Sequence, residues 1–348
     1  MRILILILSI GFLTSSCGIT YYAKIGIHQA SILWNREDIN QVLQSDNITQ
    51  KEKQKLQLIE DVRKFIDEEL PLQKSTNYTT YSKLDDDYVS YVVHAAPINS
   101  TVPYKWNYPI VGKLSYKGFP KKEDALKEAH RLEKEGYETY VRGVSAYSTL
   151  GWFRDPVLSS MLSYPDSSLV DLIIHESTHE TIYVKSNADF NEQLASFVGR
   201  VGTELYYEKK EGLDSPTIRK LLQKKHDTRI FSKFIGNFKK ELENWYKENS
   251  IGQHKDQFLK KRALKIRSMQ IYFTKEVQPK LQLYKFNSLL SKDLNNARIS
   301  VFSTYLEDQS QFQTLFNQSE NFKDFFEKLL TLKSSMNPKE DLAKIIKN

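Results

Sequence analysis

The sequence predicts an α+β fold that is mainly helical and contains one small mixed sheet. Apolar residues recur at helical spacing over residues 31–70 and again through most of the chain beyond Tyr207. The stretch over residues 88–144 is rich in aromatic and β-branched residues and is interrupted by Pro97 and Pro103, which is typical of short strands joined by turns. With 348 residues, 40% of them apolar, the chain is long enough to bury a substantial core.

The N-terminus has the order of a secretory signal: Arg2, an apolar run over residues 3–13, and small residues up to Cys17. The apolar run is too short to span a bilayer comfortably, and a retained membrane anchor is the alternative. Cys17 is the only cysteine, so it has no partner for an internal disulfide. The stretch resembles the lipobox of bacterial lipoproteins, although Leu13 lies four residues before the cysteine. This resemblance implies a signal peptide over residues 1–16 and lipidation of Cys17.

A lipidated cysteine places the mature protein on the bacterial cell envelope, held to a membrane by its acyl chains. Gly18, which follows the cysteine, favours the outer membrane by analogy with lipoprotein sorting. The formal net charge of +7 is modest for this length, and the basic residues are dispersed apart from KKRALKIR at residues 260–267. We interpret that run as a solvated helix face, and no nucleic-acid partner is expected.

Three segments follow the signal peptide. Residues 17–87 are predicted to be a helical N-terminal segment, in which the helix of KLQLIEDVRKFIDEELP ends before Pro71. Residues 88–210 form the predicted core, where a strand near residues 114–116, a helix that stops at Gly136, and a strand over residues 137–144 indicate a small sheet. Residues 211–348 form a helical C-terminal region whose aromatic stripes pack on that core.

The pentapeptide HESTH lies in a predicted helix that runs to Val184 without glycine or proline. His175 and His179 are four residues apart, so both imidazoles lie on one helix face and can bind one ion. Glu176 is offset by about 100° from His175, which lets it reach a water on that ion without replacing it. The arrangement predicts a Zn²⁺ hydrolase with His175 and His179 as ligands and Glu176 as general base.

A buried, hydrogen-bonded core imidazole is the alternative for each histidine of the pair. That interpretation is the better one for the other histidines, because none has a partner at ligand spacing: His28, His94, His130, His226 and His254.

Glu192 has two interpretations from the sequence. In DFNE, Asp189 and Glu192 have the spacing of a capping box that would begin the next helix. A metal held by two histidines also requires a third protein ligand, and Glu192 follows the zinc-binding helix after a short connection. Spacing alone does not separate these roles.

Several motifs resemble the predicted bacterial zinc aminopeptidase lipoproteins, relatives of the gluzincin metallopeptidases: YVRGVSAYSTLGWFRDPVLSSML at residues 140–162, LIIHESTHETIYV, and FNEQLASFVGRVG. The resemblance implies a zincin-like catalytic core over residues 88–210, a peptide substrate, and Glu192 as the third zinc ligand. The chain departs from related sequences at Gly199, where an acidic residue is common. It also lacks a GAMEN-like motif, which would hold the free α-amine of a substrate.

Zinc peptidases need a hydrogen-bond donor for the oxyanion that forms during hydrolysis. Five residues are candidates for this role or for the pocket wall, with structural packing as the alternative for each: Tyr147, Tyr183, Asn295, Asn296 and Tyr305.

The predicted function is that of a membrane-anchored zinc metallopeptidase, with aminopeptidase activity implied by the resemblance. Two alternatives stay open at this stage. One is a zinc endopeptidase, and the other is a non-catalytic envelope lipoprotein that uses a zincin-like helix as an interaction scaffold.

Overall fold

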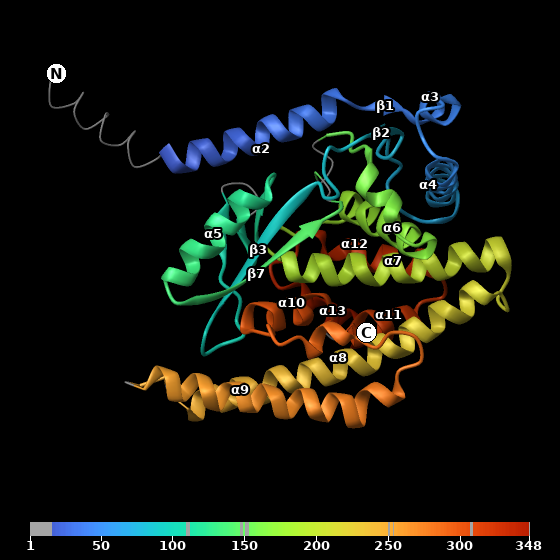
Figure 1. Ribbon diagram of the computed structural model, residues 1–348. Helices are drawn as coiled ribbons and strands as arrows, with labels where there is room; N and C mark the ends of the chain where they lie inside the picture. Colours follow the sequence, from blue (N-terminus) through green and yellow to red (C-terminus); the bar gives the residue numbers. More distant parts are fainter. Residues whose placement is uncertain are drawn as a thin grey trace, which may run out of the picture.

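The computed structural model describes residues 16–108, 112–146, 149, 153–249, 251–252, 254–306 and 309–347. They form a mainly helical protein with small sheets, which confirms the predicted mainly helical α+β class. Helix α2 (Ser16–Trp34) runs along one side of the molecule, and α8 (Pro216–Glu248) and α9 (Lys255–Tyr272) form a long pair on the opposite side (Figure 1). Within the described part of the chain, no helix combines the length and the apolar character needed to cross a membrane.

The predicted signal peptide lies outside the described residues except for Ser16, and Cys17 is the second residue of α2. Helix α2 packs beside the largest antiparallel sheet. The Tyr21 hydroxyl donates a hydrogen bond to the Gly118 carbonyl over 3.0 Å, and His28 contacts the Val89 carbonyl at 2.8 Å. These contacts hold the start of the described chain against the protein body.

The helix that the sequence predicts over residues 31–70 is broken into pieces. Helix α2 is followed by β1 (Glu37–Asp38), α3 (Ile39–Gln44) and α4 (Gln50–Glu69). The reason is local capping: Asp38 accepts from Asn40 at the start of α3, and Thr49 and Glu52 form a capping box at the start of α4. The predicted end before Pro71 is confirmed, because Leu70 is the C-cap of α4.

The described residues form three small sheets, of which one is mixed and the one built on the strand, helix, strand segment is antiparallel. In the latter, β3 (Ser90–Pro97) pairs antiparallel with both β6 (Lys117–Phe119) and β7 (Tyr137–Val144). Helix α5 (Lys122–Lys134) connects β6 to β7 and buries its apolar face on the same core cluster as β3, as the strand, helix, strand pattern predicts. The strand expected near residues 114–116 lies at β6 instead.

The other two sheets are smaller. One is the hairpin of β4 (Trp106–Tyr108) and β5 (Gly112–Leu114). The other has the order β1, β2 (Thr80–Ser82), β8 (Val157–Leu158), with β2 and β8 parallel.

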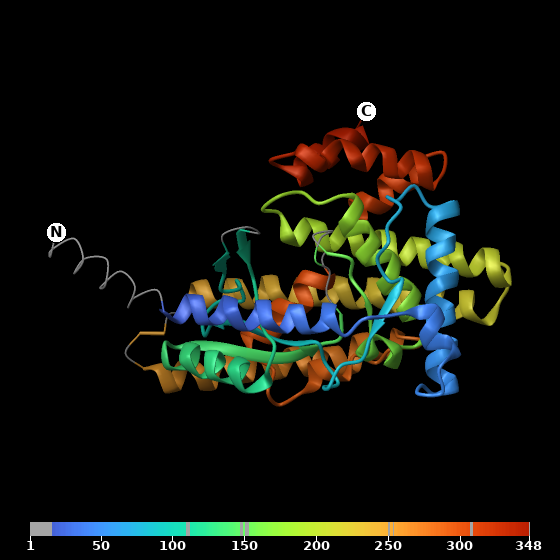
Figure 2. The same ribbon diagram turned by 90° about the horizontal axis from the view of Figure 1, so that it is seen from above.

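Two helices form the centre of the molecule: α6 (Asp166–Thr181) and α7 (Ala188–Glu211). They share one apolar core with α4 and with the last helices of the chain, which Figure 2 shows gathered along one edge of the protein: α11 (Ser310–Gln318), α12 (Phe322–Leu330) and α13 (Pro338–Lys347). A second core lies between α8 and α9, and the start of α10 (Asn296–Leu306) contributes to it. The aromatic stripe of α8 is buried there, as predicted.

Candidate metal centre

The histidines of HESTH lie in α6, whose apolar face anchors the helix in the core. Ile173 and Ile174 are fully buried, so the helix position that carries His175 is fixed by packing. The Nε2 atoms of His175 and His179 are 3.1 Å apart, and both face the same point. Two zinc ligands at about 2.1 Å in a tetrahedral site lie roughly 3.4 Å apart, so this pair is close to the spacing that zinc requires.

Glu192 completes the group from the neighbouring helix. Its Oε2 lies 3.6 Å from Nε2 of His175, and its Oε1 lies 3.5 Å from Nε2 of His179. Two imidazoles and one carboxylate are the donor set of many catalytic zinc sites, with a coordination position left for water. The residues therefore fit a zinc ion by donor type and by the separation of their donor atoms.

The capping-box interpretation of Glu192 is wrong in this structure. Helix α7 begins at Ala188, with Asn187 as an N-cap that makes no side-chain capping bond, so Asp189 is already inside the helix. The connection before α7 is fixed by Asn191, whose side chain accepts from Val184 N and donates to Val184 O, each at 2.8 Å. This clamp sets where the first turn of α7 lies.

The electrostatics of the centre favour bound positive charge. Burial alone would lower the pKa of His175, but its contact with Glu192 and the charges of Glu176 and Asp171 raise it to about 9. Burial alone would raise the pKa of Glu192, but contacts with His175 and His179 hold it well below its ordinary value. The negative carboxylates that keep His175 protonated would also stabilise a metal cation bound in place of that proton.

Glu176 follows His175 in α6 and is buried, with 8% of its surface exposed. Burial raises the pKa of its carboxyl group above the ordinary value, against the opposing charges of His175 and His179. A buried carboxylate one residue from a ligand is placed to exchange protons with a water in the centre.

Glycines allow α6 and α7 to approach closely. A Cβ added at Gly199 would lie 2.5 Å from Oδ1 of Asp171, 3.0 Å from its carbonyl oxygen and 3.3 Å from Cβ of His175. At Gly202, one turn later, an added Cβ would lie 2.9 Å from Ile174. Gly199 thus lies on the face of α7 that packs against the helix of the two histidines.

Substituting Gly199 with valine is expected to lower zinc affinity at least about 10-fold, because the helices must separate and ligand geometry is sensitive to small displacements. Metal titration of the purified variant measures the effect. The matched control is Gly236→Ala in α8, where an added Cβ meets nothing within 4 Å. That change should leave zinc affinity unaltered and add up to about 1 kcal/mol of stability through helix propensity. Equal zinc affinity in the Gly199 variant and the wild type would contradict the packing argument.

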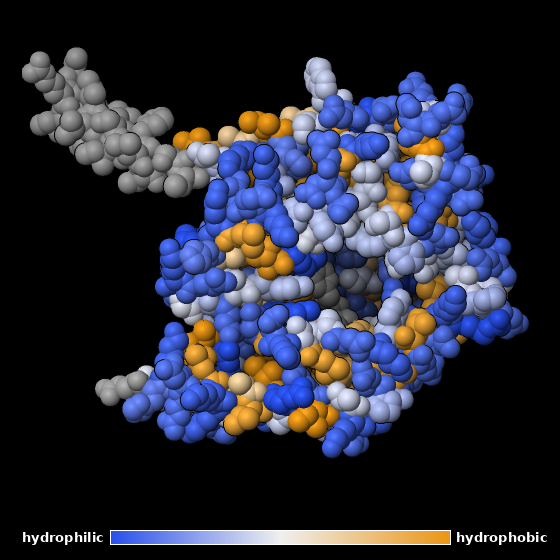
Figure 3. Space-filling model, in the orientation of Figure 1, coloured by the Kyte–Doolittle hydropathy of each residue, from blue (hydrophilic) through white to orange (hydrophobic). Residues whose placement is uncertain are grey.

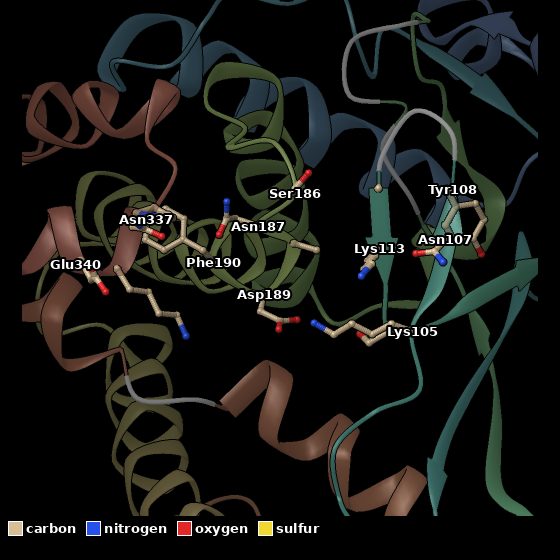
Figure 4. Close-up of a pocket in the computed structure, with 15 residues that line it drawn as sticks. Lys105, Asn107, Tyr108, Lys113, Ser186, Asn187, Asp189, Phe190, Asn337 and Glu340 are labelled. Atoms are coloured by element: carbon tan, nitrogen blue, oxygen red, sulfur yellow. The ribbon is translucent and has the colours of Figure 1, made fainter.

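A cavity of about 700 Å³ lies at the start of α7, and the described residues that line it do not include His175, Glu176, His179 or Glu192. The start of α7, the β4–β5 hairpin and the start of α13 line it, and Figure 4 shows Asp189 and Lys105 pointing toward one another across it. Asp189 is three residues before Glu192, so both project from the same side of α7. A hollow is also visible near the centre of the face that Figure 3 shows, in the orientation of Figure 1.

The residues that the sequence suggests for the pocket wall or the oxyanion donor do not gather at one place. Burial and the charge of Glu192 raise the pKa of Tyr183, which lies within electrostatic reach of the centre. Asn295 donates to the Thr139 carbonyl and Asn296 to the Pro97 carbonyl, each at 2.9 Å, so both fasten α10 to the sheet. Neither asparagine is among the residues that line the cavity. Tyr147 and the side chain of Tyr305, a residue of α10, lie outside the described part of the chain.

Comparison with known proteins identifies one family. A family model described as "Putative aminopeptidase" matches residues 20–343, which is most of the chain. No curated protein and no solved structure matches it. The chain therefore belongs to this aminopeptidase family.

Proposed function

We propose that the protein is a zinc-dependent aminopeptidase held on the bacterial cell envelope by a lipidated Cys17. The observation that supports it best is the convergence of His175, His179 and Glu192, whose donor atoms face one point from two helices. Membership of the aminopeptidase family supports the peptide substrate. The lipobox resemblance supports the membrane attachment and the outer-membrane location.

Zinc, when bound, lowers the pKa of a coordinated water to near neutrality and polarises the scissile carbonyl. The protein's own groups then handle protons and charge. The Glu176 carboxylate accepts a proton from the attacking water and passes it to the nitrogen of the leaving amine. Burial and the charge of Glu192 raise the pKa of Tyr183, so its hydroxyl keeps its proton, and we assign it the role of donor to the oxyanion.

The cavity beside α7 is the proposed position of the substrate's N-terminal residue. The Asp189 carboxylate lines the cavity and faces the Lys105 side chain across it, and the ammonium group of a substrate would take the place of that lysine (Figure 4). In a peptide, the α-ammonium group lies two bonds from the scissile carbonyl carbon. A carboxylate one helical turn from a metal ligand is therefore well placed to receive that group while the carbonyl is at the metal.

A metal assay paired with hydrolysis tests this function. The protein begun after Cys17 should carry about one zinc per chain and hydrolyse amino-acid chromogenic amides with a free N-terminus. A chelator should remove the bound zinc and abolish hydrolysis, and added zinc should restore the zinc content and the hydrolysis. Protein that takes up no zinc would contradict the proposal. Hydrolysis of blocked and free N-termini at equal rates would identify an endopeptidase instead.

Changing Asp189 to asparagine is expected to lower kcat/KM for substrates with a free N-terminus about 10- to 100-fold, because a charge-assisted hydrogen bond to the ammonium group is lost. Inhibition by an amino-acid hydroxamate should weaken similarly, whereas inhibition by its N-acetyl counterpart should not change. The control is Glu340→Gln, which removes another carboxylate of the cavity, on the α13 side shown in Figure 4. An unchanged preference for the free amine in the Asp189 variant would remove this residue from substrate recognition.

A further inference from the structure

Tyr78 has an unusual environment for a buried tyrosine. Its side chain is 3% exposed, and its hydroxyl has no hydrogen-bond partner among the described residues. Its backbone also has φ of 58°, a left-handed conformation that non-glycine residues rarely adopt. Both features cost stability, and such features persist where the surrounding structure enforces them, often at functional sites.

A chain of hydrogen bonds enforces this conformation. The Tyr78 amide donates to the Asp155 carbonyl at 2.7 Å, and the Asp155 amide donates to Oδ1 of Asn77 at 2.7 Å. The Asn77 side chain in turn donates to Oε1 of Glu180 in α6 at 2.6 Å. The segment before Tyr78 is therefore fastened to the helix that carries the zinc-binding histidines.

The same fastening sets the Tyr78 segment along the last turns of the helix that carries Glu176. The Gln73 amide donates to Oγ1 of Thr181 at 3.0 Å, and Asn77 reaches Glu180, so the segment follows the last turn of α6. Glu176 is one turn before Glu180 on the same face of that helix. After burial, the charge of Glu176 contributes most to the raised pKa of Tyr78, so the hydroxyl keeps the proton that it could donate.

We propose that Tyr78 is a positioning residue for Glu176: its hydroxyl donates a hydrogen bond to the Glu176 carboxylate when substrate is bound and holds it in the orientation for proton transfer. Catalytic hydrogen bonds of this kind are often open in the free enzyme and close in the substrate complex. The inference rests on the proposed zinc peptidase function. It adds to that function Tyr78, a residue that belongs to none of the sequence motifs described above.

Tyr78→Phe tests the assignment in the full zinc-loaded enzyme. We expect kcat to fall about 10- to 100-fold while KM for the amide substrate changes less than about twofold. Zinc content should stay at the wild-type value, and the thermal midpoint should stay equal or rise, because a buried unpartnered hydroxyl is removed. An unchanged kcat would overturn the proposal, as would a loss of zinc that accounts for the lower rate.

Tyr81→Phe is the matched control. Tyr81 is also 3% exposed and lies three residues away, but the charges that act on its hydroxyl are those of Glu52 and Glu37, away from the metal centre. This variant should keep the wild-type kcat. A loss equal to that of Tyr78→Phe would mean that the rate reports packing of the segment, and the proposal would be wrong.

A double variant separates positioning from direct contact with substrate. In the Glu176→Gln background, Tyr78→Phe should cause no further loss of the residual rate, because the carboxylate on which it acts is already absent. A further loss of the same size would place the hydroxyl on the substrate and overturn the positioning role. If the wild type itself bound no zinc and hydrolysed no peptide, the proposed function would fail first. An active wild type with an equally active Tyr78→Phe variant would refute this inference alone.

Discussion

Glu176→Gln is expected to lower kcat about 1,000-fold or more while one zinc per chain stays bound. The substitution keeps the volume of a side chain that is 8% exposed, so the packing of α6 should be preserved. Because His175, His179 and Glu192 are untouched, the metal donors stay in place. The amide of glutamine cannot accept a proton from water, so the step assigned to Glu176 is lost. Elemental analysis and steady-state hydrolysis of an amino-acid amide measure the two properties separately.

Asp166→Asn is the control, at the start of the same helix. Asp166 forms an ion pair with Lys55, so an asparagine there weakens a structural contact and leaves the metal centre intact. Its kcat should stay within about tenfold of the wild type, because the group that exchanges protons is unchanged. Wild-type activity in Glu176→Gln would contradict the general-base mechanism. Loss of zinc from that variant would show instead that Glu176 supports the metal.

The part of the site that the sequence predicts well is the part contained in one helix. The spacing of His175 and His179 fixes their shared face through helix geometry alone, and the Nε2 separation of 3.1 Å agrees with it. Glu192 could not be assigned in this way, because its distance from the histidines depends on how α7 packs against α6. The close approach at Gly199 and the clamp from Asn191 to Val184 decide that distance, and both are tertiary contacts.

Features that depend on contacts between distant parts of the sequence could not be predicted. Tyr78 lies in an ordinary polar stretch, STNYTTY, and its proposed relation to Glu176 depends on the bond between Asn77 and Glu180, which are 103 positions apart in the sequence. The breaks around α3 had local signals in Asp38 and Thr49, but the apolar periodicity that runs through them concealed the helix ends. The sheets differed from expectation because strands of two or three residues carry too little periodicity to be located.

Glu192→Gln is expected to abolish zinc-dependent hydrolysis for a different reason: the metal itself is lost. A neutral amide is a poor substitute for a carboxylate ligand, and zinc affinity should fall at least about 100-fold. Stability gives a readout that is independent of activity. At a zinc concentration about 100 times its Kd, binding stabilises the wild type by about 2.7 kcal/mol, so its thermal midpoint rises with added zinc. The variant should show little or no rise at the same concentration.

The control for this variant is Glu204→Gln, on the same helix. Glu204 forms ion pairs with Arg200 at 3.6 Å and Lys225 at 3.1 Å, so its loss should leave the zinc-dependent midpoint intact. Glu176→Gln and Glu192→Gln then make the same chemical change at two neighbouring carboxylates with opposite expected results: the first keeps zinc and loses the rate, and the second loses zinc. If Glu192→Gln bound zinc with wild-type affinity, Glu192 would not be a zinc ligand, because the loss of a ligand must weaken zinc binding.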